Sequence, residues 1–104
     1  MTTEQKGFII SAMNNINNMG KWNYISWEKF PVRMDIKDNM LITTVSGTEF
    51  KDELPMRGTR RDRDAMAKVV AGRICEAWGG TMEEVSEHAA AALAELYAVL
   101  GIQA

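Results

Sequence analysis

Residues 32–45 read VRMDIKDNMLITTV and contain two strand patterns joined by a turn. In the first half, Val32, Met34 and Ile36 alternate with charged residues, which is typical of a strand with one buried face. The second half, 40–45, is rich in β-branched residues, which favour strands. Between them, 37–39 reads Lys-Asp-Asn, and Asp and Asn tolerate left-handed turn geometry. These residues therefore predict two consecutive strands of an antiparallel sheet.

Strand patterns continue on both sides of this hairpin. Ser46-Gly47 predicts a second tight turn, and residues 48–54 are a candidate third strand after it. Residues 22–27 are a further candidate strand, which ends before Pro31. We therefore expect an antiparallel meander of three or four strands.

The segment before the sheet predicts a helix over 3–19. Thr3 can cap its start, and Gly20 lies where a left-handed closing residue is expected. Its apolar residues recur at the spacing that lines one helical face: Phe8, Ile9, Ala12, Met13, Ile16 and Met19.

Two more helices are predicted after the sheet. The first has the apolar stripe Met66, Val69, Val70, Ile74, Ala77 and Trp78, and Gly79-Gly80 ends it. The second begins at Thr81, with Glu84 completing a capping box. Its predicted core face is Met82, Val85, Ala89, Leu93, Leu96 and Leu100. The expected fold is one α+β domain over 1–104, with both C-terminal helices packed on one face of the sheet.

Composition restricts the class of protein. The chain has 12 basic and 14 acidic residues and a net charge of −2, so a general electrostatic attraction to nucleic acid or to a membrane surface is not expected. The single cysteine, Cys75, cannot form an internal disulfide, which favours a reducing compartment. The first apolar run, 8–13, is too short for a signal peptide or a membrane span. We expect a cytoplasmic protein with no membrane association.

No group of residues matches a catalytic or metal-binding pattern. His88, the only histidine, is offset from the apolar stripe of its helix and is expected to be exposed. Cys75 lies in a helix interior without a facing cation, so we expect a half-buried structural thiol. One histidine and one cysteine cannot build a structural zinc site. The carboxylate pairs lie in charged, solvated stretches, and no phosphate-binding glycine loop is present. The sequence therefore predicts a non-enzyme without metal or cofactor.

Residues 21–33 form the first candidate binding segment. Four aromatic residues occur within nine positions of this segment, interleaved with basic residues. Alternation along a strand places Trp22 and Tyr24 on the face opposite Trp27. Three interpretations remain open: Trp27 and Phe30 fill the core, the segment binds a protein, or its aromatics stack on single-stranded nucleic acid. The candidate partner-binding residues are Trp22, Tyr24, Lys29 and Arg33.

The second candidate is the arginine-rich stretch 57–64. It contains Arg57, Arg60, Arg61 and Arg63, partly neutralised by Asp62 and Asp64. One interpretation is a solvated helix start, in which Asp64 pairs with Lys68 at i,i+4. The other is an arginine anchor for phosphate or for an acidic protein surface, because the planar guanidinium makes two-point contacts.

The last helix is unusually apolar. Between Ala89 and Ile102 the only charged residue is Glu95, so the helix is apolar nearly all round. It is either the central helix of the core or a self-association face that forms a homodimer, and its many alanines allow close helix approach.

The leading prediction is a non-enzymatic interaction protein, a small regulator or inhibitor that binds a larger protein or protein complex. Aromatic residues and arginine are the residue types that anchor such interfaces. The alternative is a nucleic-acid-binding module that uses the aromatic strand and the arginine-rich helix start. The near-balanced charge favours the protein partner.

Overall fold

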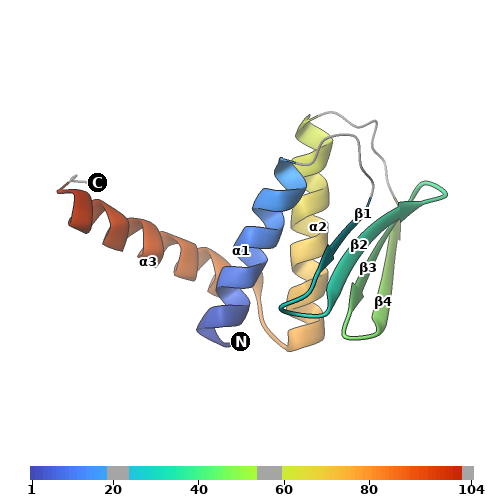
Figure 1. Ribbon diagram of the computed structural model, residues 1–104, viewed down its shortest axis with the longest axis horizontal. Helices are drawn as coiled ribbons and strands as arrows, with labels where there is room; N and C mark the ends of the chain where they lie inside the picture. Colours follow the sequence, from blue (N-terminus) through green and yellow to red (C-terminus); the bar gives the residue numbers. More distant parts are fainter. Residues whose placement is uncertain (19–23, 54–59, 102–104) are drawn as a thin grey trace.

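The computed structural model describes residues 1–18, 24–53 and 60–101, without the side chains of residues 60–62. The elements in chain order are α1 (Thr3–Asn17), β1 (Tyr24–Trp27), β2 (Val32–Lys37), β3 (Met40–Val45), β4 (Thr48–Glu53), α2 (Arg60–Trp78) and α3 (Met82–Leu100) (Figure 1). The predicted α+β fold is confirmed: a helix, an antiparallel meander, and two C-terminal helices.

The sheet has the strand order β1-β2-β3-β4, and each strand pairs antiparallel with its neighbour in sequence. The β2–β3 turn has positive φ at Asp38 (53°) and Asn39 (61°). The β3–β4 turn has positive φ at Ser46 (49°) and Gly47 (88°). Two-residue hairpin turns with positive φ at both positions match the right-handed twist of the strands they join. Both predicted turns are therefore present.

The sheet has one covered face and one open face. Alternate residues of the central strands, such as Val32 and Met34 on β2 and Leu41 on β3, are buried. α1 and α2 lie on the side of this covered face, with α2 in contact with β3 (Figure 1). The residues between them in sequence, such as Arg33, point to the open face, which no described element covers. The hydrophobic core therefore lies between the sheet and the helices.

Aromatic rings close one end of this core. Phe8 of α1 lies 5.8 Å from Trp27, 5.0 Å from Phe30 and 5.8 Å from Trp78, measured between ring centroids. Tilted and edge-to-face pairs at these distances are the favoured ring geometries. Trp27 and Phe30 thus occupy the place that the core-packing interpretation gives them.

Helix ends follow local capping chemistry. The predicted cap of α3 is present: the Thr81 hydroxyl accepts from Glu84 N, and the Glu84 carboxylate accepts from Thr81 N. For α1 the predicted cap was wrong, because the N-cap is Thr2 and not Thr3. Gln5 lies three residues after Thr2. The Thr2 hydroxyl accepts from Gln5 N and the Gln5 side-chain oxygen accepts from Thr2 N, so both backbone donors are satisfied. α1 ends at Asn17, and Met19 and Gly20 lie outside the described residues.

The last helix is not the central helix of the core. Its first turns pack on α1, and Val85 is buried there, but the rest of α3 projects away from the body (Figure 1). The predicted core face is therefore wrong beyond Ala89, and the exposed large side chains are Leu93 (48%), Leu96 (51%), Val99 (79%) and Leu100 (60%). The helix is about 28 Å long, and α1 crosses only its beginning.

Candidate functional site

The outward side of β1 carries Tyr24, which is 46% exposed, while Ile25 and Trp27 are directed to the covered side. Tyr24 therefore lies on the face opposite Trp27, as strand alternation predicts. Trp22, the other aromatic expected on this face, lies outside the described residues. Across the sheet, Tyr24 is in register with Asp35, and Asp35 with Ile42.

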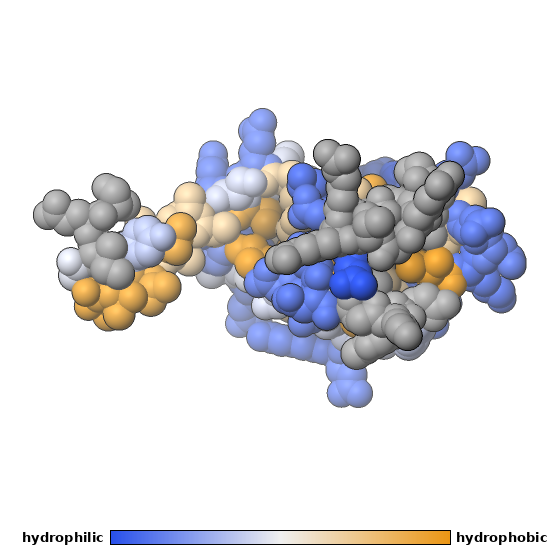
Figure 2. Space-filling view, turned by 90° about the horizontal axis from the view of Figure 1, so that it is seen from above, coloured by the Kyte–Doolittle hydropathy of each residue, from blue (hydrophilic) through white to orange (hydrophobic). Residues whose placement is uncertain are grey.

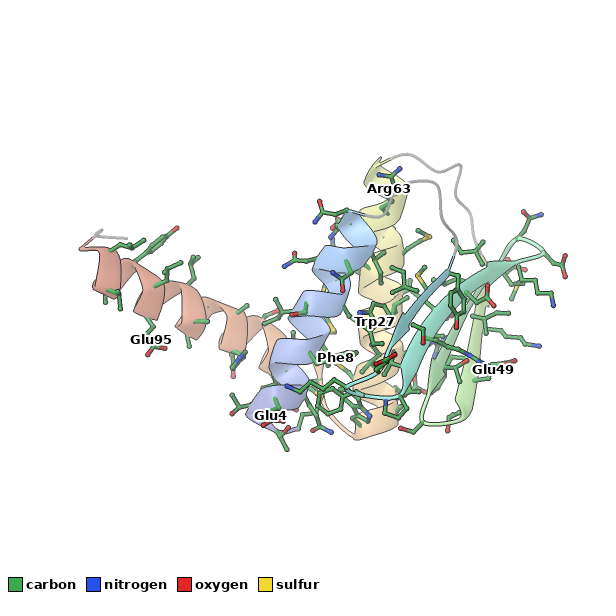
Figure 3. The ribbon with its side chains drawn as sticks, in the orientation of Figure 1. Glu4, Phe8, Trp27, Glu49, Arg63 and Glu95 are labelled. Atoms are coloured by element: carbon green, nitrogen blue, oxygen red, sulfur yellow. The ribbon has the colours of Figure 1, made fainter. Side chains whose placement is uncertain are left out.

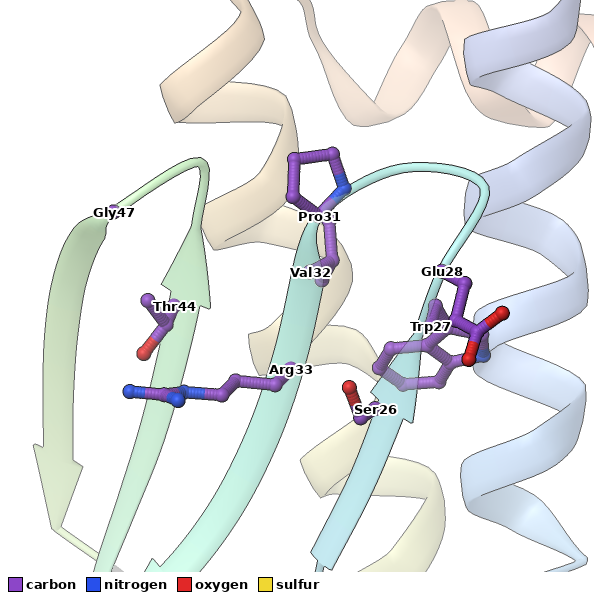
Figure 4. A pocket seen from close by; sticks show the side chains of 8 residues that line it. All are labelled: Ser26, Trp27, Glu28, Pro31, Val32, Arg33, Thr44 and Gly47. Carbon is purple, nitrogen blue, oxygen red and sulfur yellow. The ribbon is translucent and has the colours of Figure 1, made fainter.

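A depression of about 470 Å³ lies on the open face beside the end of β1. Ser26, Arg33 and Thr44 are cross-strand neighbours in its floor. Figure 4 shows the Arg33 side chain extending across β3 toward Thr44, while Trp27 and Glu28 border the other side. A guanidinium near the Thr44 hydroxyl can bind a carboxylate or carbonyl oxygen.

A second depression, of about 510 Å³, lies between α1 and the β1–β2 turn. α1 contributes Glu4 and Phe8, and the turn contributes Lys29. Trp27 and Glu28 line both depressions, so the two adjoin along this indole. We call the combined area, from α1 across the turn to Arg33, the Trp27 surface.

The indole at the centre of this surface is held in place. Trp27 Nε1 donates to Asn15 Oδ1 over 2.9 Å, and Phe8 packs against the ring edge-to-face. Figure 3 shows Phe8 and Trp27 meeting between α1 and β1. The Trp27 surface therefore has a fixed aromatic centre and charged margins.

The two predicted sets of binding residues are not brought together in the part of the chain that the structure describes. Lys29 and Arg33 both belong to the Trp27 surface. Arg57 and the side chains of Arg60 and Arg61 lie outside the described residues. Arg63 is partly buried near the start of α2, away from the β1–β2 turn (Figure 3).

Charges on the open sheet face are evenly mixed. The outward positions carry the basic residues Arg33, Lys37 and Lys51 and the acidic residues Asp35, Glu49 and Glu53. Lys51 Nζ lies 3.5 Å from Glu49 Oε1. A phosphate backbone lying on this face would meet as many carboxylates as cations.

His88 and Cys75 are both less exposed than the sequence predicts. His88 was predicted to be exposed, but it is partly buried, because α3 crosses α1 beside Gly7, where a Cβ on Gly7 would lie 4.0 Å from the imidazole Nε2. Cys75 is 3% exposed, and its Sγ lies 3.6 Å from Met82 Sδ. Burial, with a smaller contribution from the Glu84 charge, raises the pKa of the Cys75 thiol. Among the described residues no group of three or more His, Cys, Asp or Glu side chains is placed to hold a metal ion.

The exposed part of α3 is a second candidate surface. We call Ala89, Ala92, Leu93, Leu96, Val99 and Leu100 the α3 stripe; they lie on the same side of the helix as the buried Val85. Figure 2 shows hydrophobic side chains gathered at this projecting end. Three of the other alanines of α3, Ala90, Ala94 and Ala98, lie on the opposite side of the helix.

No helix in the described part of the chain is long and apolar enough to cross a membrane. Comparison of the chain with protein-family models, with curated proteins and with solved structures finds no match in any of the three.

Proposed function

We propose that this protein is a non-enzymatic interaction protein, a small cytoplasmic regulator or inhibitor that binds a larger protein or protein complex through the Trp27 surface. The observation that carries the proposal is the pair of adjoining depressions that share Trp27 and Glu28. Tryptophan and arginine are the residue types most enriched among the residues that dominate binding energy. Here Trp27 lies between the depressions and Arg33 lies in one of them.

The geometry suits side chains that protrude from a partner. An apolar side chain can pack against Phe8 and Trp27 in the second depression, while Arg33 binds an acidic or carbonyl group on the outer side of the sheet. The Asn15 hydrogen bond and the Phe8 contact fix the indole before binding. Fixing an anchor in advance reduces the entropy that association costs.

Nucleic acid is the less favoured partner. Single-stranded binding needs several stacking aromatics and a positive groove. The described open face offers one exposed aromatic, Tyr24, and equal numbers of basic and acidic side chains.

The single cysteine supports a cytoplasmic location. We also propose a homodimer through α3, which does not depend on the Trp27 surface.

Charge reversal on the Trp27 surface tests this function. We expect the unmodified chain to retain a protein partner from an extract of its native host, and the double variant K29E/R33E to lose it. The matched control K37E/K51E reverses two exposed charges on the same sheet outside both depressions, so it should retain the partner. Circular dichroism establishes that both variants are folded. Equal retention by K29E/R33E and the control would exclude the Trp27 surface, and retention abolished by nuclease would favour the nucleic-acid alternative.

A further inference from the structure

The isolated chain exposes more surface than a compact protein of its mass. Its accessible surface is 6938 Å², whereas a compact monomer of 11.6 kDa exposes about 5,800 Å². Its radius of gyration is 14.6 Å, compared with about 13 Å for a compact chain of this length. The longest dimension, 48 Å against 29 and 22 Å for the other two, lies along the direction in which α3 projects (Figure 1).

The excess has the size of an interface. Over the whole chain, the projecting α3 included, it amounts to about 1,100 Å², and each partner in a standard stable interface buries about 800 Å². The surface that α3 adds is apolar: the α3 stripe contains no charged residue, and Glu95 beside it is the only charge between Ala89 and Leu100. α1 covers this side of the helix at Val85 but leaves the stripe from Leu93 onward exposed.

The order of side-chain sizes along the stripe fits a second copy of the same helix. The small residues, Ala89 and Ala92, lie near the body, and the large ones, Leu96 and Val99, lie near the tip. An antiparallel helix centred on residue 94 places Leu96 on Ala92 of the second copy, and the same register places Val99 on its Ala89. Both of these layers pair a large side chain with a small one, which favours close helix packing, and the same register brings Leu100 level with His88 of the second copy.

We propose that the α3 stripe is covered by the α3 stripe of a second copy, antiparallel across a two-fold axis near residue 94. Each residue then makes the reciprocal contact, as a two-fold interface demands. The axis brings the two Leu93 side chains together on one flank, which extends the apolar contact. On the other flank it brings the two Glu95 carboxylates near each other, which is a small unfavourable term at the exposed margin.

Sedimentation of the full chain at high micromolar concentration tests the dimer. We expect a dimer for the unmodified chain, a monomer for L96E, and a dimer for the control A94E, which places the same charge on the opposite side of α3. E95Q removes the like-charge pair and should lower the dissociation constant by about twofold. If α3 instead bound a groove with basic margins on a different protein, E95Q would weaken that binding, because the charge of Glu95 would be lost from the contact. A monomeric unmodified chain, or a dimer that A94E disrupts as strongly as L96E, would overturn the arrangement.

Cross-linking tests the register without a destabilising charge. Under oxidising conditions L93C should form a disulfide-linked dimer, and A98C, on the opposite side of the helix, should not. The buried Cys75 does not compete in the folded protein. Cross-linking of A98C but not of L93C would contradict the proposed axis. The dimer does not depend on the Trp27 surface, so a monomer that still retains its protein partner would overturn the dimer alone.

Discussion

The guanidinium of Arg73 on α2 holds the carboxylate of Asp52 on β4 through two hydrogen bonds, with Nε 3.0 Å from Oδ2 and Nη2 2.5 Å from Oδ1. The same guanidinium lies over the Phe50 ring, 5.5 Å from its centroid, and its Nη1 donates to Glu76 over 2.9 Å. One side chain therefore joins the last strand of the sheet to the helix behind it.

This pair predicts how stability depends on pH. The hydrogen bonds from Arg73 hold the pKa of Asp52 below its ordinary value. A lowered folded-state pKa contributes stability above the unfolded-state value, and this stability is lost as pH falls through the folded-state value. D52N should therefore lower the free energy of unfolding by about 1 kcal/mol at neutral pH. Urea unfolding should show this difference shrinking as the solution is made acidic; a difference independent of pH would contradict the assignment.

The core contains one hydroxyl that weakens it. Thr43 is 0% exposed, and its Oγ1 has no hydrogen-bond partner among the described residues. T43V keeps the branched shape and removes the unsatisfied group, so it should raise the free energy of unfolding by about 1 kcal/mol. Chemical denaturation measures the change. T44V, on the open face of the same strand, serves as the control and should alter stability little.

Replacing Gly72 and Gly79 by alanine should change the stability of the protein in opposite directions. Gly72 lies inside α2, and an added Cβ would meet no described atom within 4 Å. G72A should therefore stabilise the protein by about 0.5–1 kcal/mol. Gly79 ends α2 with a φ of 71°, which disfavours alanine, so G79A should destabilise it. Thermal unfolding of both variants checks the pair, and stabilisation by G79A would refute the C-terminal geometry of α2.

Cys75 should be inert in the folded protein. Its thiol is buried, and its raised pKa leaves little thiolate at neutral pH. An aromatic disulfide reagent should react with native protein only as fast as the chain opens, and immediately in denaturant. Fast labelling of the native chain would show that the α2–α3 junction is open.

Local patterns predicted the parts of the fold that depend on residues close together in the sequence. Asp38-Asn39 predicted a turn because these side chains tolerate positive φ, and Thr81 with Glu84 predicted a cap because each satisfies a backbone donor of the other. The exposure of Leu96 was not predictable in this way. Helical periodicity identifies an apolar face, but the same spacing occurs whether that face is covered by its own chain or by another.

The candidate site was predicted in part. Lys29 and Arg33 were identified because they flank aromatics in one segment, and both lie on the Trp27 surface. The contribution of α1 was missed, because Glu4 and Phe8 reach this surface only through tertiary packing and no local pattern marks them. The partial burial of His88 was missed for the same reason, since it results from the crossing of α3 with α1 near Gly7.

The strand order β1-β2-β3-β4 also has a kinetic consequence. Every strand pairs with its neighbour in sequence, so the sheet forms by closing short loops, whose entropy cost is small. α1 is different, because it packs against α2 and α3, which follow only after the whole sheet. Docking of the N-terminal helix is therefore the step with the longest loop to close. Folding rates should be sensitive to the α1 contacts, while the hairpins assemble quickly and independently of that helix.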